Sequence, residues 1–182
     1  LADRVDAIVQ KQLERSQNSV FLSTAWYKAL YNNLCRIVQR SAGVLAEHER
    51  RGQFRPYAVE VGFGTDDPDS LPSLVLTLAG GEKVNLHGRI DRIDIAALPE
   101  KQETYIRVID YKSGHKTLKL WEIFYGLKLQ LILYLETALA GLQLPGSVKP
   151  AGMFYFHVAD PMLKCDNALS LSTEDQLKKI LK

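Results

Sequence analysis

Two acidic residues and a lysine stand among β-strand-forming residues in the middle of the chain. Residues 88–91 read Gly-Arg-Ile-Asp, and residues 108–112 read Val-Ile-Asp-Tyr-Lys. An isolated charge in such an apolar run is unfavourable unless it has a partner or a function. Asp91, Asp110 and Lys112 are therefore the first candidates for chemistry in this sequence.

The segments that carry these residues are predicted to form a β-hairpin. Residues 84–95 and 104–112 are rich in Val, Ile, Leu and Tyr, and a polar segment with a proline separates them, which is a hairpin pattern. If the pairing is symmetric about that segment, Asp91 and Asp110 face each other across neighbouring strands, with Cβ atoms about 5 Å apart. Side-chain alternation places Lys112 on the same face as Asp110.

Two neighbouring carboxylates repel each other unless a positive group neutralises them. Mg²⁺ does so, because it binds oxygen ligands and commonly uses one or two carboxylates together with waters and phosphates. Lys112 beside Asp91 and Asp110 would position an attacking water or stabilise a phosphoryl transition state. A structural ion pair of Asp110 with Lys112 or with Arg89 is the alternative, and the sequence leaves both interpretations open.

The same alternation places Arg92 and Asp94 on the face of the strand away from Asp91. We expect these two residues to form a structural pair rather than to take part in catalysis.

A polar pair lies on the helix that is expected to follow the hairpin. Residues 120–140 predict one long helix, with Gly141 as the residue just beyond its end. Gln130 and Tyr134 are four residues apart and therefore share one face. A glutamine buried in an apolar face needs hydrogen-bond partners, which are either groups of an active site or backbone groups of the core.

The remaining elements place these residues in an α/β fold. The order predicts a mixed central β-sheet flanked by helices, and the 120–140 helix allows a right-handed crossover to the last strand. The expected helices and strands, besides the two hairpin strands and that helix, are an opening helix with Val5, Ile8, Val9 and Leu13, a helix over 23–50 that Ser23 or Thr24 caps, strands over 58–63, 74–78 and 151–158, and a helix over 173–182.

Length and composition are consistent with one globular domain. The chain has 182 residues, 46% hydrophobic and 24% charged, which is enough for a core of its own. It lacks an apolar run long enough for a membrane span, and a net charge of +2 neither requires nor excludes nucleic acid. Because the chain opens within a helix, we expect residues 1–182 to be a single domain from a longer protein.

The ordered set of motifs resembles the PD-(D/E)XK nuclease superfamily, in particular its RecB-like branch. The matching pieces are the Gly-Arg-Ile-Asp motif, the Asp-Tyr-Lys motif, and Gln130 with Tyr134. The doubled Gly-Arg-Ile-Asp-Arg-Ile-Asp, the run Tyr-Gly-Leu-Lys-Leu-Gln-Leu and residues 150–158 are most similar to the C-terminal nuclease domain of AddB-type subunits of bacterial helicase–nucleases. The resemblance covers nearly the whole chain and implies the PD-(D/E)XK, restriction-endonuclease-like core.

The resemblance also implies an activity and a metal site. The activity would be a Mg²⁺-dependent exodeoxyribonuclease, for which Mn²⁺ substitutes, that joins a helicase–nuclease partner subunit in double-strand break repair and recombination in the bacterial cytoplasm. Asp91, Asp110, the backbone carbonyl of Tyr111 and the Glu60 carboxylate would bind the metal. The catalytic residues would be Asp91, Asp110, Lys112, Gln130 and Tyr134. Glu60 has a second interpretation, as a solvent-facing residue of an edge strand.

Further roles follow from the same resemblance. Gln130 and Tyr134 would lie beside the metal and act with the catalytic residues. Ser113 and Lys116, in the polar loop after Lys112, would bind DNA together with Tyr134, either single-stranded or at duplex ends.

Two features of the sequence depart from the family pattern. A histidine of the metal site precedes the sheet in the family, and His48, between two glutamates, cannot be matched to that motif. The four-cysteine pattern of an iron–sulfur cluster is not present, so Cys35 and Cys165 are expected to be ordinary thiols of a reducing compartment. A catalytically weak or inactive DNA-binding or scaffolding module of the same fold, or an RNA-acting relative, therefore stays open.

Overall fold

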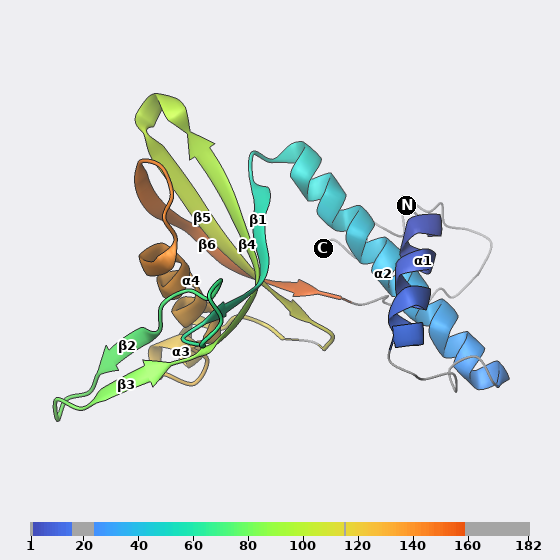
Figure 1. Cartoon of the computed structure of the whole chain (residues 1–182), viewed down its shortest axis with the longest axis horizontal. Helices are drawn as coiled ribbons and strands as arrows, with labels where there is room; N and C mark the ends of the chain where they lie inside the picture. Colours follow the sequence, from blue (N-terminus) through green and yellow to red (C-terminus); the bar gives the residue numbers. More distant parts are fainter. Residues whose placement is uncertain (1, 16–23, 115, 159–182) are drawn as a thin grey trace.

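The computed structural model describes residues 2–15, 24–114 and 116–158. Figure 1 shows these residues in two parts, a β-sheet with α3 and α4 on one side, and the paired helices α1 and α2 at the other end. The predicted fold class, a mixed sheet flanked by helices, is confirmed.

The central sheet has four strands in the spatial order β1-β4-β5-β6. Strand β4 lies antiparallel to both β1 and β5, whereas β5 and β6 are parallel. A parallel pair needs a crossover connection, and α3 and α4 supply it. The bounds of the four strands are Arg55–Phe63 for β1, Gly88–Leu98 for β4, Glu103–Lys112 for β5 and Ser147–His157 for β6.

The predicted hairpin joins β4 to β5 in the predicted symmetric register. A short 3₁₀ turn over Pro99–Lys101 and Gln102, which has a positive φ of 51°, connect the two strands. Arg92 is paired with Ile109, so Asp91 and Asp110 are the next residues along the two strands. The symmetry of the turn was therefore sufficient to predict which residues oppose each other.

The strand expected over 84–95 is two strands in the structure. Strand β3 (Lys83–Leu86) pairs with β2 (Leu74–Thr77) in a separate two-stranded sheet, and β4 begins only at Gly88. The break has a packing cause at Gly64, which ends β1 with a φ of 65°. A Cβ at that position would lie 2.6 Å from the carbonyl oxygen of Leu86. The backbone of Gly64 thus packs where the chain turns from β3 into β4.

The expected long helix over 120–140 is also divided, and that prediction was wrong. Helix α3 (Leu120–Phe124) ends in a Schellman motif, in which the N–H groups of Gly126 and Leu127 bond to the carbonyls of Ile123 and Glu122. Gly126 has a φ of 73°, a conformation that favours glycine. Helix α4 then begins separately.

Helix α4 spans Gln130–Gly141, so Gly141 is its last residue rather than the residue beyond its end. A Cβ at Gly141 would lie 3.2 Å from Pro72 Cδ and 3.3 Å from Leu71 Cβ. This glycine therefore allows a close approach of the 71–72 segment and does not supply a left-handed turn.

The core lies between the sheet and α4. It contains Ile90 and Ile93 of β4, Ile106 and Val108 of β5, and Leu131 of α4. Each of these side chains is almost completely buried. The core therefore fixes α4 on the same face of the sheet that is expected to carry Asp110.

Helices α1 (Ala2–Arg15) and α2 (Ala25–Arg51) pack on each other. Val5 and Val9 of α1 are buried against Cys35 of α2, as their helical spacing predicts. Thr24 caps α2 as expected, since its hydroxyl accepts a hydrogen bond from the backbone N–H of Tyr27 at 3.3 Å.

Two expectations, the helix over 173–182 and the thiol of Cys165, lie outside the described residues. Of the helices within the described ranges, none combines the length and apolar character that a membrane-spanning helix requires.

Candidate active site

Asp110 is the most buried member of the candidate site, with 1% of its surface exposed. Its Oδ1 accepts a hydrogen bond from Gln130 Nε2 at 3.1 Å. The Lys112 ammonium forms an ion pair with Oδ2, yet no group in the described part of the chain donates a well-oriented hydrogen bond to this buried oxygen. Burial raises the pKa of the Asp110 carboxyl, the Lys112 contact opposes that shift, and the negative charge of Asp91 adds to it.

Lys112 has three neighbours that fix its ammonium group. Besides the ion pair with Asp110, its Nζ donates to Gln130 Oε1 at 3.3 Å and lies 5.7 Å from the centre of the Tyr155 ring. Burial lowers the pKa of Lys112, but the close contact with the Asp110 carboxylate and the negative charge of Asp91 outweigh burial and raise it overall. The ammonium is thus held in its charged form beside the carboxylates.

Gln130 connects the helix to the two strand residues. Its amide nitrogen donates to Asp110 and, at 2.8 Å, to the hydroxyl of Tyr134, while its carbonyl oxygen accepts from Lys112. The expectation of a buried glutamine was wrong, because Gln130 is exposed at the first turn of α4. Since all three of these partners are side chains, the interpretation of a core glutamine bonded to the backbone is also wrong.

Asp91 is held by the neighbouring strand. Its Oδ2 accepts a hydrogen bond of 2.7 Å from the backbone N–H of Tyr111. Ile90 and Ile93 pack in the same core although they are three residues apart, so the alternation of β4 is interrupted between them. This irregularity sets the Asp91 carboxylate against the peptide group of Tyr111, next to Asp110.

Glu60 lies opposite this irregularity on β1 but does not join the other residues. Its backbone φ is 52°, its side chain is exposed, and its carboxylate pairs with Arg89 at 3.4 Å. Among the described contacts, none links Glu60 to Asp91 or Asp110.

The loop after Lys112 exposes Ser113 and Lys116 at the edge of the site. A contact of 3.0 Å between His157 Nδ1 and the carbonyl of Gly114 ties this loop to β6. The charge of Lys116 is close enough to contribute to lowering the pKa of Asp110.

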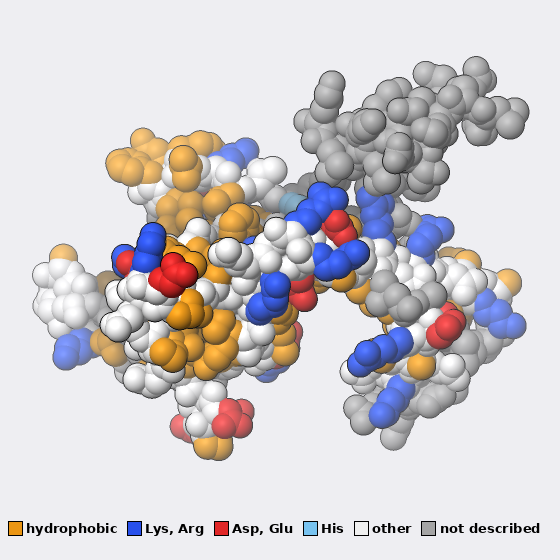
Figure 2. Space-filling view, turned by 90° about the horizontal axis from the view of Figure 1, so that it is seen from above, with side chains coloured by type: hydrophobic (Ala, Val, Ile, Leu, Met, Phe, Trp, Pro, Cys, Tyr) orange, Lys and Arg blue, Asp and Glu red, His pale blue; other side chains and the backbone are white. Residues whose placement is uncertain are grey.

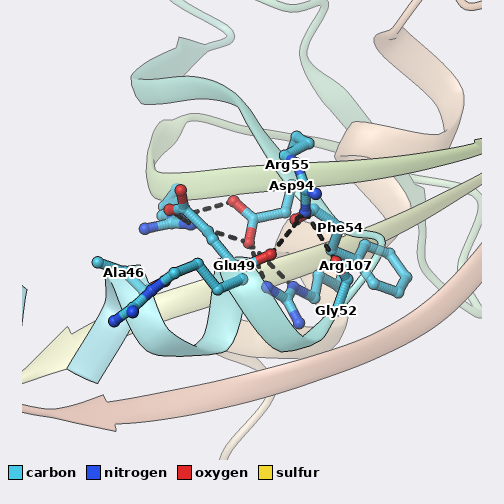
Figure 3. A network of polar contacts seen from close by, with 9 residues as sticks. Ala46, Glu49, Gly52, Phe54, Arg55, Asp94 and Arg107 are labelled. Atoms are coloured by element: carbon cyan, nitrogen blue, oxygen red, sulfur yellow. Dashed lines mark hydrogen bonds and ion pairs between the residues drawn. The ribbon is translucent and has the colours of Figure 1, made fainter. Parts of the chain in front are cut away.

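The opposite face of the same strands carries a second ionic cluster, drawn in Figure 3. Asp94 is completely buried and accepts hydrogen bonds from Arg92 and Arg107, and Arg92 also bonds Glu49 of α2 at 3.0 Å. The predicted pair of Arg92 and Asp94 is confirmed. Arg107 also lies 4.6 Å from the centre of the Phe54 ring.

Sequence reasoning missed Arg107 and Tyr155. The symmetric hairpin register places Arg107 directly opposite Asp94, so that register was a sufficient signal. Tyr155 lies opposite Asp110 on the parallel strand β6, and no sequence pattern fixes the register of a crossover connection. His48 lies near Arg92 on the α2 face of the sheet, opposite the face that carries Asp110.

The mixed sheet flanked by helices is consistent with the fold of a nuclease superfamily. The chain belongs to the PD-(D/E)XK nuclease superfamily, whose family model matches residues 1–182. Among curated proteins it is similar to the AddB-type subunit of the ATP-dependent helicase/deoxyribonuclease of several bacteria. The subunit of Acetivibrio thermocellus is 40% identical over 182 residues, which cover 99% of this chain, and that of Pelotomaculum thermopropionicum is 42% identical over 177 residues, which cover 96%.

A third relative, the same subunit of Caldanaerobacter subterraneus subsp. tengcongensis, is 38% identical over 99% of this chain. The chain spans about 15% of the length of each of these relatives. The resemblance to AddB-type subunits is thereby confirmed.

Proposed function

We propose that this chain is a metal-dependent deoxyribonuclease domain that hydrolyses DNA phosphodiester bonds. The observation that carries the proposal is the buried Asp110 carboxylate, which is ion-paired with Lys112 and whose pKa is raised by burial and by the nearby charge of Asp91. Neighbouring carboxylates whose charges repel each other favour a bound cation. Perturbed acids of this kind are common at functional sites.

The donor set fits Mg²⁺, with Mn²⁺ as a substitute. Asp91 and Asp110 would hold the ion, together with the backbone carbonyl of Tyr111. Within the described residues no group of three or more His, Cys, Asp or Glu side chains converges, so waters and phosphate oxygens would have to complete the coordination of the ion. A bound ion of this kind activates water and neutralises charge on the phosphate. To bind the ion as well, the Glu60 carboxylate would first have to break its ion pair with Arg89.

The protein groups have separate tasks in this mechanism. The Lys112 ammonium would stabilise negative charge that develops on the phosphate, because it is already fixed in place at the site. Gln130 would hold the spacing of Lys112 and Asp110, and Tyr134 would orient the Gln130 amide. Ser113 and Lys116 would contact phosphates that flank the cleaved bond.

The names of the relatives support a wider role for the protein. We propose that it works on DNA with a helicase–nuclease partner subunit in the bacterial cytoplasm, in double-strand break repair and recombination, and that it cuts from strand ends as an exonuclease.

The test is cleavage of end-labelled single-stranded DNA, duplex DNA and RNA in Mg²⁺, Mn²⁺ or EDTA. We expect metal-dependent cleavage of DNA by the wild type and none by Asp110→Asn. Glu103→Gln is the matched control, because Glu103 lies on the same strand at its other end, paired with Lys149. Isothermal titration with Mn²⁺ should show a site that Asp110→Asn lacks. DNA binding that needs no metal and leads to no cleavage would instead identify a scaffolding module. Faster cleavage of RNA than of DNA would identify RNA as the substrate.

A further inference from the structure

The segment between Lys112 and Gln130 carries an exposed aromatic surface that the proposed mechanism does not use. Trp121 is 54% exposed, Phe124 83% and Tyr125 70%. Large exposed apolar patches on a soluble protein usually mark a binding surface. In Figure 2, hydrophobic side chains gather over the body that holds the sheet, α3 and α4, whereas Lys and Arg are more frequent toward α1 and α2.

The three rings lie on one side of α3. Residues three and four positions apart are neighbours on a helix, which places Phe124 and Tyr125 next to Trp121. The rings of Phe124 and Tyr125 contact each other edge to face, with centroids 5.3 Å apart. The surface therefore combines a contacting pair of rings, Phe124 and Tyr125, with Trp121 one helical turn away.

This aromatic surface is attached to the candidate active site at both ends. The chain leaves the site at Lys112 and returns to it at Gln130, and the side chains of these two residues meet at 3.3 Å. The Schellman turn at Gly126 directs the chain from α3 back into α4. Helix α3 is therefore joined to the candidate active site through both of its flanking segments.

The charges around the rings are suited to an anionic ligand. Lys116 and Lys119 are exposed, and the Lys119 ammonium lies 5.8 Å from the centre of the Trp121 ring. The one acid of α3, Glu122, is neutralised by an ion pair with Lys128 at 2.6 Å. Aromatic rings interleaved with lysines are the composition of surfaces that bind single-stranded nucleic acid, because every unpaired base offers a face for stacking.

We propose that α3 is a base-stacking platform for single-stranded DNA. Unpaired bases stack on Trp121, Phe124 and Tyr125, while Lys116 and Lys119 contact the neighbouring phosphates. Bases within a duplex are already stacked on each other, so the platform selects strands that are unpaired near the cleaved bond. This inference rests on the proposed nuclease function, since it assigns the substrate of that same site.

The first test is the affinity for a short fluorescein-labelled oligothymidylate, measured by anisotropy in EDTA so that no strand is cut. We expect Trp121→Ala, Phe124→Ala and Tyr125→Ala each to weaken binding by about fivefold or more, as loss of one stacked base does. The matched control is Trp26→Ala, which removes a tryptophan of α2 that is somewhat more exposed than Trp121 (67% against 54%) and should leave the affinity unchanged. Because all these side chains are exposed, thermal melts of the variants should coincide with that of the wild type.

A second probe separates stacking from charge. An abasic strand of the same length keeps the phosphates but lacks all bases, so it should bind the wild type more weakly than oligothymidylate binds Trp121→Ala, which removes only one of the three rings. The chain has two tryptophans, so Trp26→Phe leaves Trp121 as the single reporter. Its fluorescence should be quenched by oligothymidylate and not by the abasic strand.

The outcomes distinguish this inference from the proposed function. If the wild type cuts DNA but Trp121→Ala, Phe124→Ala and Tyr125→Ala bind oligothymidylate normally, the platform is wrong and the α3 surface belongs to a protein neighbour. If the wild type cuts no nucleic acid but these variants lose affinity, the platform stands and the nuclease assignment fails. Equal binding of abasic and normal strands would also overturn the platform.

Discussion

The two faces of the β4–β5 hairpin each hold a buried aspartate, and they differ in how completely that aspartate is satisfied. On the α2 face, Asp94 accepts four hydrogen bonds from Arg92 and Arg107, at 2.6–3.1 Å. On the α4 face, Asp110 accepts one hydrogen bond from Gln130 and an ion pair from Lys112. A fully bonded acid serves the fold, whereas an acid with unused acceptor capacity remains available for a ligand.

The largest expected effect is a loss of stability when Asp94, the fully hydrogen-bonded aspartate of the α2 face, is removed. Asp94→Ala leaves two guanidinium groups without their shared partner, and breaking such a buried pair costs about 3–5 kcal/mol. Chemical denaturation should measure that loss in the free energy of unfolding. Cleavage per folded molecule should be retained, and a variant that stays stable but inactive would reverse the roles of the two faces.

The second largest effect is a loss of activity when Lys112, on the α4 face, is removed. Lys112→Ala should lower the cleavage rate by about 100- to 1000-fold, the size expected when one fixed electrostatic group of an active site is lost. Its melting temperature should fall, because the buried Asp110 carboxylate loses its ion-pair partner, so the rate is compared per folded molecule. The loss of cleavage rate is measured under single-turnover conditions, in Mn²⁺ and with enzyme in excess over DNA. Robust cleavage by the variant would remove Lys112 from the mechanism.

A smaller effect is expected for Gln130, which bonds both Asp110 and Lys112. Gln130→Ala should slow cleavage at least about tenfold, or about 1.4 kcal/mol of barrier, with a melting shift of only a few degrees since the residue is exposed. Tyr134→Phe is the companion variant, because it removes only the hydroxyl that Gln130 bonds. Early melting with normal cleavage per folded molecule would assign Gln130 to the fold instead.

The smallest effect is expected for Glu60, which lies outside both clusters. Its pair with Arg89 is exposed on both sides, so Glu60→Gln should change the free energy of unfolding by less than about 1 kcal/mol. We expect Mn²⁺ affinity and the cleavage rate to stay close to those of the wild type. A lost metal site in this variant would show that Glu60 turns inward when the ion binds.

Much of the hairpin could be predicted from the sequence because its register depends on local symmetry. The pairing of Arg92 with Ile109 and the Arg92–Asp94 pair follow from that symmetry and from side-chain alternation. The break between α3 and α4 at Gly126 could not be predicted in this way. A glycine inside a helix costs only about 1 kcal/mol, so its presence does not by itself indicate that the helix ends there. The close packing of Gly64 and Gly141 and the positive φ of Glu60 depend on tertiary contacts that a sequence pattern does not reveal.

The hairpin that joins Asp91 to Asp110 has a consequence for the order of folding. Its ends are close in sequence, so it is expected to form early, because short loops lose little entropy on closure. The parallel pairing of β5 with β6 and the docking of α4 bring together more distant segments and should follow. In a nascent chain, Asp91 and Asp110 would then lie on a solvent-exposed hairpin before α4 docks and brings Gln130 next to them. Docking of α4 would then be the step that buries Asp110 and completes the candidate site, so partly folded chains are expected to be inert toward DNA.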